Sequence, residues 1–214
     1  MRSPEMGMGE PEKQSPELTR ERLADLQTLE VEIEADFGDT LQALRETTGA
    51  DLQPRPEGYH LVIIDPTESK VLSTLEDATL TELQHINEQI QGGEGISIKG
   101  VGFIDGASST YRMREVDKGK KTAFLALEIP ALQAFRSKIG LPQKDFHITL
   151  GFEGGDIHVQ VVRQEPRKPG SPKMKDVTAP IPKQADPRFS TLALPDIRYG
   201  GLDGQRREQT ERPQ

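Results

Sequence analysis

Proline and charge are unevenly distributed along this chain, and this limits where a packed core can form. Eight of the 16 prolines fall in residues 163–214, together with 11 basic and seven acidic residues. Such a segment holds little apolar surface and is expected to stay extended in solvent. The regular apolar patterns lie instead in residues 51–162. We therefore predict a charged helical arm at 1–50, one folded domain at 51–162, and a proline-rich, basic, disordered tail at 163–214.

The overall composition excludes several classes of protein. The chain has no cysteine, which rules out disulfides and thiolate metal sites. It has no apolar run long enough for a membrane-spanning helix, and residues 1–14 are polar, without a hydrophobic signal region. Its net charge of −8 argues against duplex DNA, which usually meets a basic face. We expect a cytoplasmic protein that binds neither membrane nor duplex DNA; its oligomeric state is left open.

Residues 1–50 carry a helical pattern. Ser15-Pro16-Glu17 has the order of a helix start, with serine as the N-cap and proline in the first turn. Gly49 is a typical C-terminal stop. Between them, large apolar residues recur at spacings of 7, 4, 4 and 3, at Leu26, Ile33, Phe37, Leu41 and Leu44. We expect an amphipathic arm that packs on the domain or on a second copy of the chain.

The central domain alternates between strand and helix patterns. The predicted elements are a strand at 59–65, a helix at 80–90, strands at 96–104 and 122–129, a helix at 130–139, and strands at 146–152 and 157–162. The turn at 153–156 is typical of a hairpin that joins the last two strands. This order predicts an α+β fold of two similar lobes, each a small antiparallel sheet with a helix.

Two segments of the domain repeat one pattern, an aromatic residue and a histidine followed by a strand. They are Tyr59-His60-Leu61-Val62-Ile63-Ile64 and Phe146-His147-Ile148-Thr149-Leu150-Gly151. Because side chains alternate along a strand, His147, Thr149 and Gly151 share one face, where Gly151 is expected to leave open space. An imidazole exchanges protons near neutral pH, and a threonine hydroxyl can donate to a phosphoryl oxygen. Paired side by side, these strands would form a slot with a histidine on each wall.

The string from Phe146 to Phe152 resembles the second His-x-Thr motif of the two-histidine (2H) phosphoesterases. With the Tyr-His…Ile-Ile-Asp-Pro string at 59–66, it is most similar to the Swiss Army Knife branch, and the resemblance covers about residues 55–162. It implies a bilobal fold and, in its central cleft, a catalytic site that needs neither a metal nor another cofactor. It further implies a phosphodiesterase acting on RNA or nucleotide ends such as 2′,3′-cyclic phosphates, with His60, His147 and Thr149 as catalytic residues.

The first motif departs from the family pattern, because Val62 stands where the family has serine or threonine. A hydroxyl that would stabilise charge on phosphorus is therefore missing, which places full activity in question. The alternative function is a catalytically weakened module that binds nucleotide or RNA ends, or a protein partner. A purely structural role for His60 also stays open. Of the other histidines, His85 is expected to face solvent, and His158 either flanks the site or is structural.

Five basic residues crowd the connection between the two middle strands: Arg112, Arg114, Lys118, Lys120 and Lys121. In an otherwise acidic domain, such a cluster is suited to holding phosphate or a short RNA end. On this interpretation Arg112, Arg114 and Lys121 bind the substrate. The alternative is an ordinary solvated loop, and the sequence does not separate the two.

Overall fold

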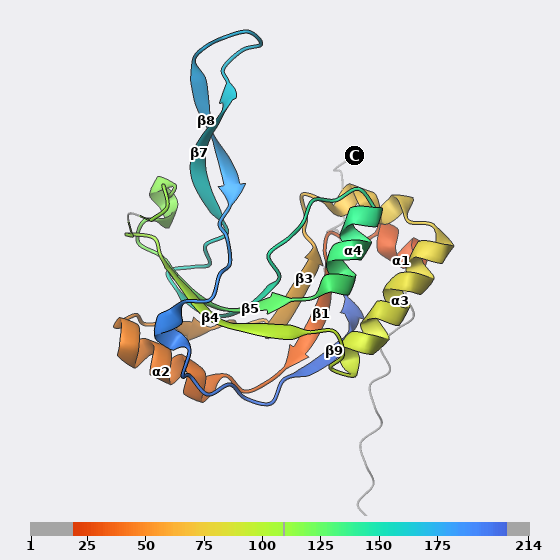
Figure 1. The fold of residues 1–214 in the computed structure, drawn as a ribbon, viewed down its shortest axis with the longest axis horizontal. Coiled ribbons are helices and arrows are strands. Elements are labelled where there is room, and N and C mark those ends of the chain that lie inside the picture. Colours follow the sequence, from red (N-terminus) through yellow and green to blue (C-terminus); the bar gives the residue numbers. More distant parts are fainter. Residues whose placement is uncertain (1–18, 109, 205–214) are drawn as a thin grey trace, which may run out of the picture.

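The computed structural model describes residues 19–108 and 110–204 as an α+β fold with two antiparallel sheets (Figure 1). The main sheet has seven strands in the order β4-β5-β6-β3-β1-β9, with β2 paired to β6; β7 and β8 form a separate two-stranded ribbon. The strands are β1 (Leu29–Glu34), β2 (Gln53–Pro54), β3 (Tyr59–Ile64), β4 (Ser97–Asp105), β5 (Lys121–Glu128), β6 (His147–Glu153), β7 (Val159–Pro166), β8 (Met174–Pro180) and β9 (Arg198–Asp203). The α-helices are α1 (Arg20–Ala24), α2 (Gly38–Thr48), α3 (Asp77–Gln91) and α4 (Pro130–Lys138), with 3-10 helices η1 (Ser69–Thr74), η2 (Glu115–Asp117) and η3 (Pro187–Phe189).

Most elements predicted between residues 59 and 152 are confirmed. The strands β3, β4, β5 and β6 and the helices α3 and α4 lie where their patterns indicated, and β4 pairs with β5 as expected. Helix α3 buries residues at helical spacing, namely Leu80, Leu83, Ile86 and Ile90. Helix α4 has Pro130 in its first turn and is followed by Gly140, whose φ of 78° is a conformation that glycine adopts readily.

Strand β1 lies where the sequence predicted a helical arm, and for this stretch the prediction is wrong. Its residues alternate, so that Leu29, Val31 and Ile33 are buried, whereas the glutamates between and after them lie on the other face. The spacing of seven between Leu26 and Ile33 suits a helix, but alternation of apolar and acidic residues has the period of a strand. β1 pairs with β3 on one side and with β9 on the other, so the main sheet begins upstream of residue 51.

The later part of the predicted arm is helical as expected. Helix α2 buries Leu41 and Leu44 against the sheet, and it ends at Gly49, whose φ is 67°. The short helix α1 precedes β1, and its N-cap Thr19 accepts a hydrogen bond from the Arg22 backbone amide. The helix start predicted at Ser15 lies outside the described residues.

The tail was predicted to be disordered, and for residues 163–204 that prediction is wrong. β9 joins the main sheet beside β1, and its Leu202 is buried together with Phe189 of η3. Apolar residues are few in this segment, but the edge of β1 offers them a partner, which averaged composition does not reveal. The main sheet therefore extends past residue 162 as well, and the predicted domain boundaries at 51 and 162 both fall inside it.

The predicted hairpin between the strands at 146–152 and 157–162 is also not present. β6 already has β5 along one edge and β3 with β2 along the other, so no edge is free for the following strand. β7 pairs with β8 instead. The two small sheets expected of two lobes are joined into one, because β3 and β6 meet at a single register pair, Leu61 opposite Ile148.

The main core fills one face of this sheet. Residues of α2, α3 and α4 pack there against Leu61, Leu125, Ile148 and Leu150 in one buried cluster. The buried guanidinium of Arg136 ties α4 to the end of β3, donating to the Ile63 carbonyl and to both oxygens of Glu68. A small second cluster, which includes Phe124 and Ala126 of β5, lies apart from this main core.

Candidate active site

The structure brings both predicted histidines onto one face of adjoining strands. Leu61 and Ile148 are opposite each other and point into the core, so the residues that flank them point to the other face. By this antiparallel register His60 is opposite Thr149, while Val62 is opposite His147. The two histidines are thus diagonal neighbours, a relation in which residues of adjacent strands lie about 7–8 Å apart.

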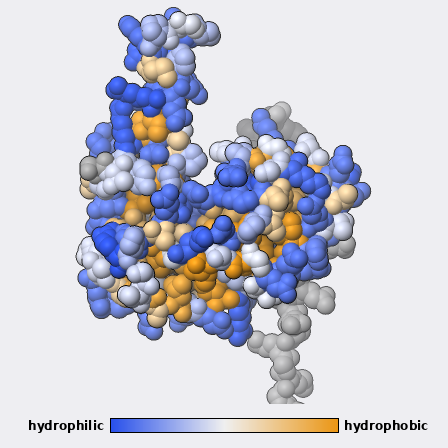
Figure 2. All heavy atoms as spheres, in the orientation of Figure 1, coloured by the Kyte–Doolittle hydropathy of each residue, from blue (hydrophilic) through white to orange (hydrophobic). Residues whose placement is uncertain are grey.

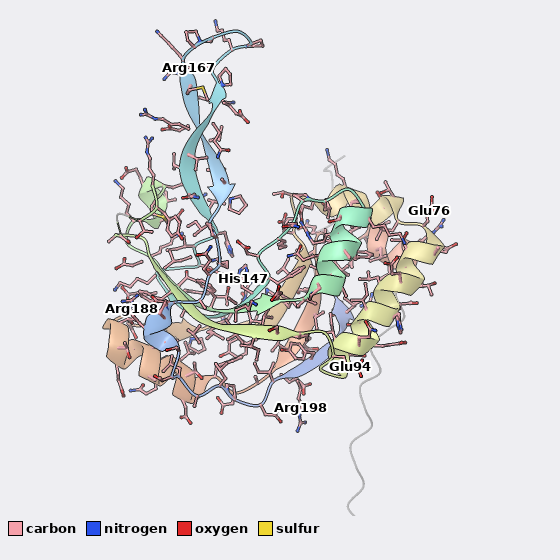
Figure 3. All side chains as sticks on the ribbon, viewed as in Figure 1. Glu76, Glu94, His147, Arg167, Arg188 and Arg198 are labelled. Atoms are coloured by element: carbon pink, nitrogen blue, oxygen red, sulfur yellow. The ribbon has the colours of Figure 1, made fainter. Side chains whose placement is uncertain are left out.

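This face forms the floor of a hollow. Figure 2 shows a recess between the base of the β7–β8 ribbon and the part of the molecule that contains α3 and α4. In the same orientation, His147 lies on β6 at the foot of that recess (Figure 3). A ligand in the hollow would therefore meet the sheet at the histidine strands.

His147 is held in one orientation by its neighbours. Its Nδ1 lies 2.9 Å from the carbonyl oxygen of Asp145, and its ring meets the Phe124 ring edge-on, with centroids 6.0 Å apart. Burial, followed by the positive charge of Lys183, lowers the pKa of His147 to about 3. The ring is therefore neutral at pH 7. With Nδ1–H donating to the carbonyl, Nε2 carries the free lone pair.

His60 lies between a carboxylate and a guanidinium that affect its charge in opposite ways. Its side chain is 12% exposed, and Nε2 lies 3.8 Å from a carboxylate oxygen of Glu30 on β1. Burial, followed by the charge of Arg55, lowers the pKa of His60 to about 4. Burial likewise raises the pKa of Glu30 above its ordinary value. The strand that the sequence analysis mistook for a helix thus supplies the acid beside the first histidine.

Thr149 is bonded to an acidic residue from the loop after β6. Its hydroxyl donates to Asp156 Oδ2 at 2.9 Å, and the same oxygen lies 3.3 Å from His158 Nε2. Burial would raise the pKa of Asp156, but the charges of His158 and Lys183 and the hydroxyl of Thr149 bring it below its usual value. Asp156 and His158 influence the pKa of both His60 and His147, which links the two imidazoles electrostatically.

The model of the Swiss Army Knife 2H phosphoesterase domain matches residues 30–158, a span that contains both histidine strands. The chain belongs to this family. Membership places the domain in the phosphoesterase class, and the matched segment begins in β1 and ends at His158. No curated protein and no solved structure matches the chain. Among the described residues no helix is long and apolar enough to cross a membrane.

Lys183 lies outside the 2H segment and was not identified from the sequence. Its side chain is 6% exposed, and Nζ donates to the Ile157 carbonyl at 2.8 Å and lies 4.8 Å from the centre of the Phe124 ring. Its backbone amide donates to Asp145 Oδ2 at 3.2 Å, on the residue whose carbonyl holds His147. Burial lowers the pKa of Lys183 to about 8, so it is mostly charged at pH 7. In the sequence Lys183 is a single lysine between Pro182 and Pro187, and no motif there indicates that it would be buried beside a histidine.

A close approach on β4 allows the segment of Lys183 to reach the site. At Gly102 a Cβ atom would lie 2.4 Å from the Gln184 carbonyl oxygen and 2.3 Å from the Phe124 ring. Any larger residue would displace both. The Asp186 amide then donates to the Val101 carbonyl at 2.8 Å, which fixes the segment along β4.

Arg55 is a second residue that the sequence analysis missed. It follows β2, which pairs with β6 so that Pro54 is opposite Gly151. The prediction that Gly151 leaves open space is wrong, because a Cβ atom at this position would lie 2.7 Å from the Gln53 carbonyl oxygen. The glycine instead allows the close approach of β2. Arg55 Nη1 lies 3.9 Å from Asp156 Oδ2, which brings a guanidinium to the edge of the site.

The basic connection between β4 and β5 lies elsewhere. Arg112 pairs with Asp176 at 2.7 Å, Arg114 with Asp117 at 2.5 Å, and Lys121 with Glu153 at 3.0 Å. Lys118 and Lys120 are also in ion pairs, with acids of η2. Lys121 is opposite Glu153, six residues along β6 from His147, or about 20 Å at the rise of a strand. These cations are not gathered around the histidines, so their role in binding substrate stays a prediction.

The two remaining histidines differ in position. His85 is exposed on α3, where it lies 3.6 Å from Glu88, as expected of a solvent-facing residue. His158 lies beside Asp156, next to the site. Within residues 19–108 and 110–204, no three acidic or histidine side chains are grouped closely enough to hold a metal ion.

Proposed function

We propose that the chain is a phosphodiesterase that opens 2′,3′-cyclic phosphates at RNA or nucleotide ends by acid–base catalysis that needs no metal. The observation that carries the proposal is the placement of His60 and His147 on one face of adjoining strands, with Asp156 and His158 as common neighbours. Two imidazoles on either side of one phosphorus are suited to giving and taking a proton in the same step.

The neighbours of each histidine suggest which role it takes. Nε2 of His147 has its lone pair free, because Nδ1–H donates to Asp145, so His147 is suited to take a proton from the attacking water. His60 faces Glu30, which favours its protonated form once an anionic phosphate is also bound. His60 then donates a proton to the ribose oxygen as the P–O bond of the ring breaks. The water oxygen stays on phosphorus, and the product is a phosphate monoester.

Two cations that were not predicted from the sequence are suited to binding the phosphate. Lys183 and Arg55 both act on the pKa of a site histidine, which places their charges near the reacting groups. The hydroxyl of Thr149 donates a hydrogen bond to Asp156, so it can bind a phosphate oxygen only by giving up that partner. Val62, opposite His147, offers no hydrogen bond. The site therefore relies on fixed charges more than on a pair of hydroxyls.

The proposed function is tested by incubating the purified chain with the four 2′,3′-cyclic nucleotides in EDTA and following the product by phosphorus NMR. Turnover to a single monoester, lost in His147→Ala and in His60→Ala, is the expected result. His85→Ala is the matched control, because His85 is exposed on α3 away from the site.

A second candidate function is a module that binds nucleotide ends without turning them over. Val62 favours it, because the site then lacks a donor where charge builds up on phosphorus. Tight binding of a cyclic nucleotide with no monoester formed, in wild type and in Val62→Thr alike, would reject the enzyme and support this module.

A further inference from the structure

The two strands of the β7–β8 ribbon supply none of the catalytic candidates described above, and they lie beyond the matched 2H segment, which ends at residue 158. It projects from the body beside the hollow, with Arg167 near its far end and His147 at the foot of the recess (Figures 1 and 3). Residues 163–170 are all exposed. An isolated two-stranded ribbon is at best marginally stable, so the ribbon is not expected to be there to stabilise the fold.

The ribbon is basic in an acidic protein. Residues 159–180 contain five basic and two acidic residues, a net charge of +3, so the rest of the chain is net −11. Near its base the charges are paired, with Asp176 bound by Arg112 and Arg163. At the tip they are not: in the described part of the chain no carboxylate pairs with Arg167, Lys168 or Lys173. The unpaired positive charge is therefore concentrated at the far end.

The tip is held in a defined shape. The amide of Arg167 donates to the carbonyl of Lys173 at 2.7 Å, and the amide of Ser171 donates to the carbonyl of Lys168 at 2.9 Å. Prolines within and beside the turn, at 166, 169 and 172, restrict the backbone further. A ligand that binds these cations loses less conformational entropy than it would on a flexible tail.

The base of the ribbon is built into the wall of the site. Ile157 and Ile181, which flank the two strands, are buried with Phe124, the ring that contacts both His147 and Lys183. The amide of Ile181 donates to the carbonyl of His158 at 3.0 Å. A ligand that leaves the hollow on this side therefore meets the ribbon next.

We propose that the β7–β8 ribbon binds the phosphate backbone of a single RNA strand whose end lies in the hollow. The proposal rests on the proposed function, which places a phosphoester end near His147. An RNA strand that continues from that end would bring its phosphates to the basic tip. An acidic protein would also carry negative charge, but the proposed reaction gives no reason for one to bind there. The eight residues of β7 span about 27 Å, and stacked nucleotides advance about 3.4 Å each, so the tip is reached by a strand of roughly eight nucleotides.

The test measures fluorescence anisotropy of labelled RNA of two, four, eight and sixteen nucleotides, each ending in a 3′-phosphate. The variant is Arg167→Ala/Lys168→Ala/Lys173→Ala. The matched control removes three exposed bases of the body, Lys70→Ala/Lys99→Ala/Arg198→Ala. Wild-type affinity is expected to rise up to about eight nucleotides and then level off. The tip variant should bind the octamer with roughly tenfold lower affinity. The slope of the logarithm of its binding constant against the logarithm of salt concentration should be shallower by about two, because each phosphate contact on a single strand contributes about 0.7.

Each outcome decides the proposal. Equal octamer affinity in the tip variant and the control would overturn it, as would an equal loss of binding to a polyglutamate peptide of the same charge. The measurement needs no turnover, so failure of the enzyme assay would reject the proposed function without affecting this result. If cyclic phosphates do turn over, the preference for an octamer end over a mononucleotide should shrink in the tip variant.

Discussion

The two histidine strands, β3 and β6, are similar in sequence but differ in their surroundings. On β6, His147 is followed by Thr149, and its ring is held by a backbone carbonyl and a phenyl ring. On β3, His60 is followed by Val62, and its ring faces the carboxylate of Glu30. The cation that acts most on each histidine also differs, with Lys183 near His147 and Arg55 near His60.

This difference gives two similar motifs unlike electrostatic surroundings. A nearby ammonium favours the neutral imidazole, and a nearby carboxylate favours the charged one. The asymmetry does not depend on the motif residues themselves, because Glu30 comes from β1 and Lys183 comes from the C-terminal segment.

The largest expected effect is the loss of either histidine. His147→Ala and His60→Ala should each lower kcat by about 10³-fold or more, and the double variant should be hardly worse, because the pair acts as one unit. Initial rates on the best cyclic nucleotide measure this. Additive losses in the double variant would show that the two residues do not act on the same phosphate.

The next effect concerns the residues that follow each histidine. Thr149→Val should lower kcat by roughly 10²-fold, because it removes a donor and leaves the buried Asp156 without its hydroxyl partner. Val62→Thr should raise kcat by less than about tenfold, since a new hydroxyl opposite His147 is rarely well oriented. A harmless Thr149→Val beside an inactive His147→Ala would contradict the arrangement described for β6.

Acid stability tests whether both imidazoles are held neutral. Their pKa values in the folded protein, about 3 and about 4, lie below that of the unfolded chain. The unfolded state therefore binds more protons between about pH 4 and 6.5, so the free energy of unfolding falls as the pH drops through this range. Urea unfolding at pH 7 and pH 5 should show a loss of about 1–2 kcal/mol per histidine. His60→Asn and His147→Asn should each reduce that loss, and an unchanged loss would contradict the pKa directions.

The smallest effect separates the two histidines from each other. Lys183→Met removes a positive charge that lowers the pKa of His147, so that pKa should rise, while the pKa of His60 should change less. Ring-nitrogen NMR titrations measure both. Lys70→Met, at an exposed lysine on η1, is the control. An equal rise for both histidines would mean that Lys183 acts on the whole site and not on one wall.

The part of the site that follows from local alternation was predictable from the sequence. At the start of β6, Phe146, Ile148 and Leu150 are buried in the core, which leaves His147 and Thr149 for the other face, as predicted. The helices α3 and α4 and the β4–β5 pair were predictable for the same reason, since their periodicity lies within a single element. The family resemblance was confirmed as well.

The failures share a cause, which is contact between distant segments. β1 was taken for a helix because its partners, β3 and β9, are specified only by the fold. Lys183 and Arg55 carry no motif, and their places depend on close approaches at Gly102 and Gly151. Gly151 was read as empty space because its partner strand β2 is only two residues long. The ion pairs of Arg112 and Lys121 with acids of other segments could not be predicted from charge clustering either.

The segment that holds Lys183 has a consequence for how the protein is made. Chains are synthesised from the N-terminus, and domains begin to form as their residues emerge. Both histidines are available once residue 147 has been added, but the Lys183 ammonium, the Ile181 contact and the β9 edge arrive only with residues 181–203. A nascent chain therefore carries both histidines before it has the Lys183 charge that lowers the pKa of His147. The order of translation delays a complete site until the last quarter of the chain is present.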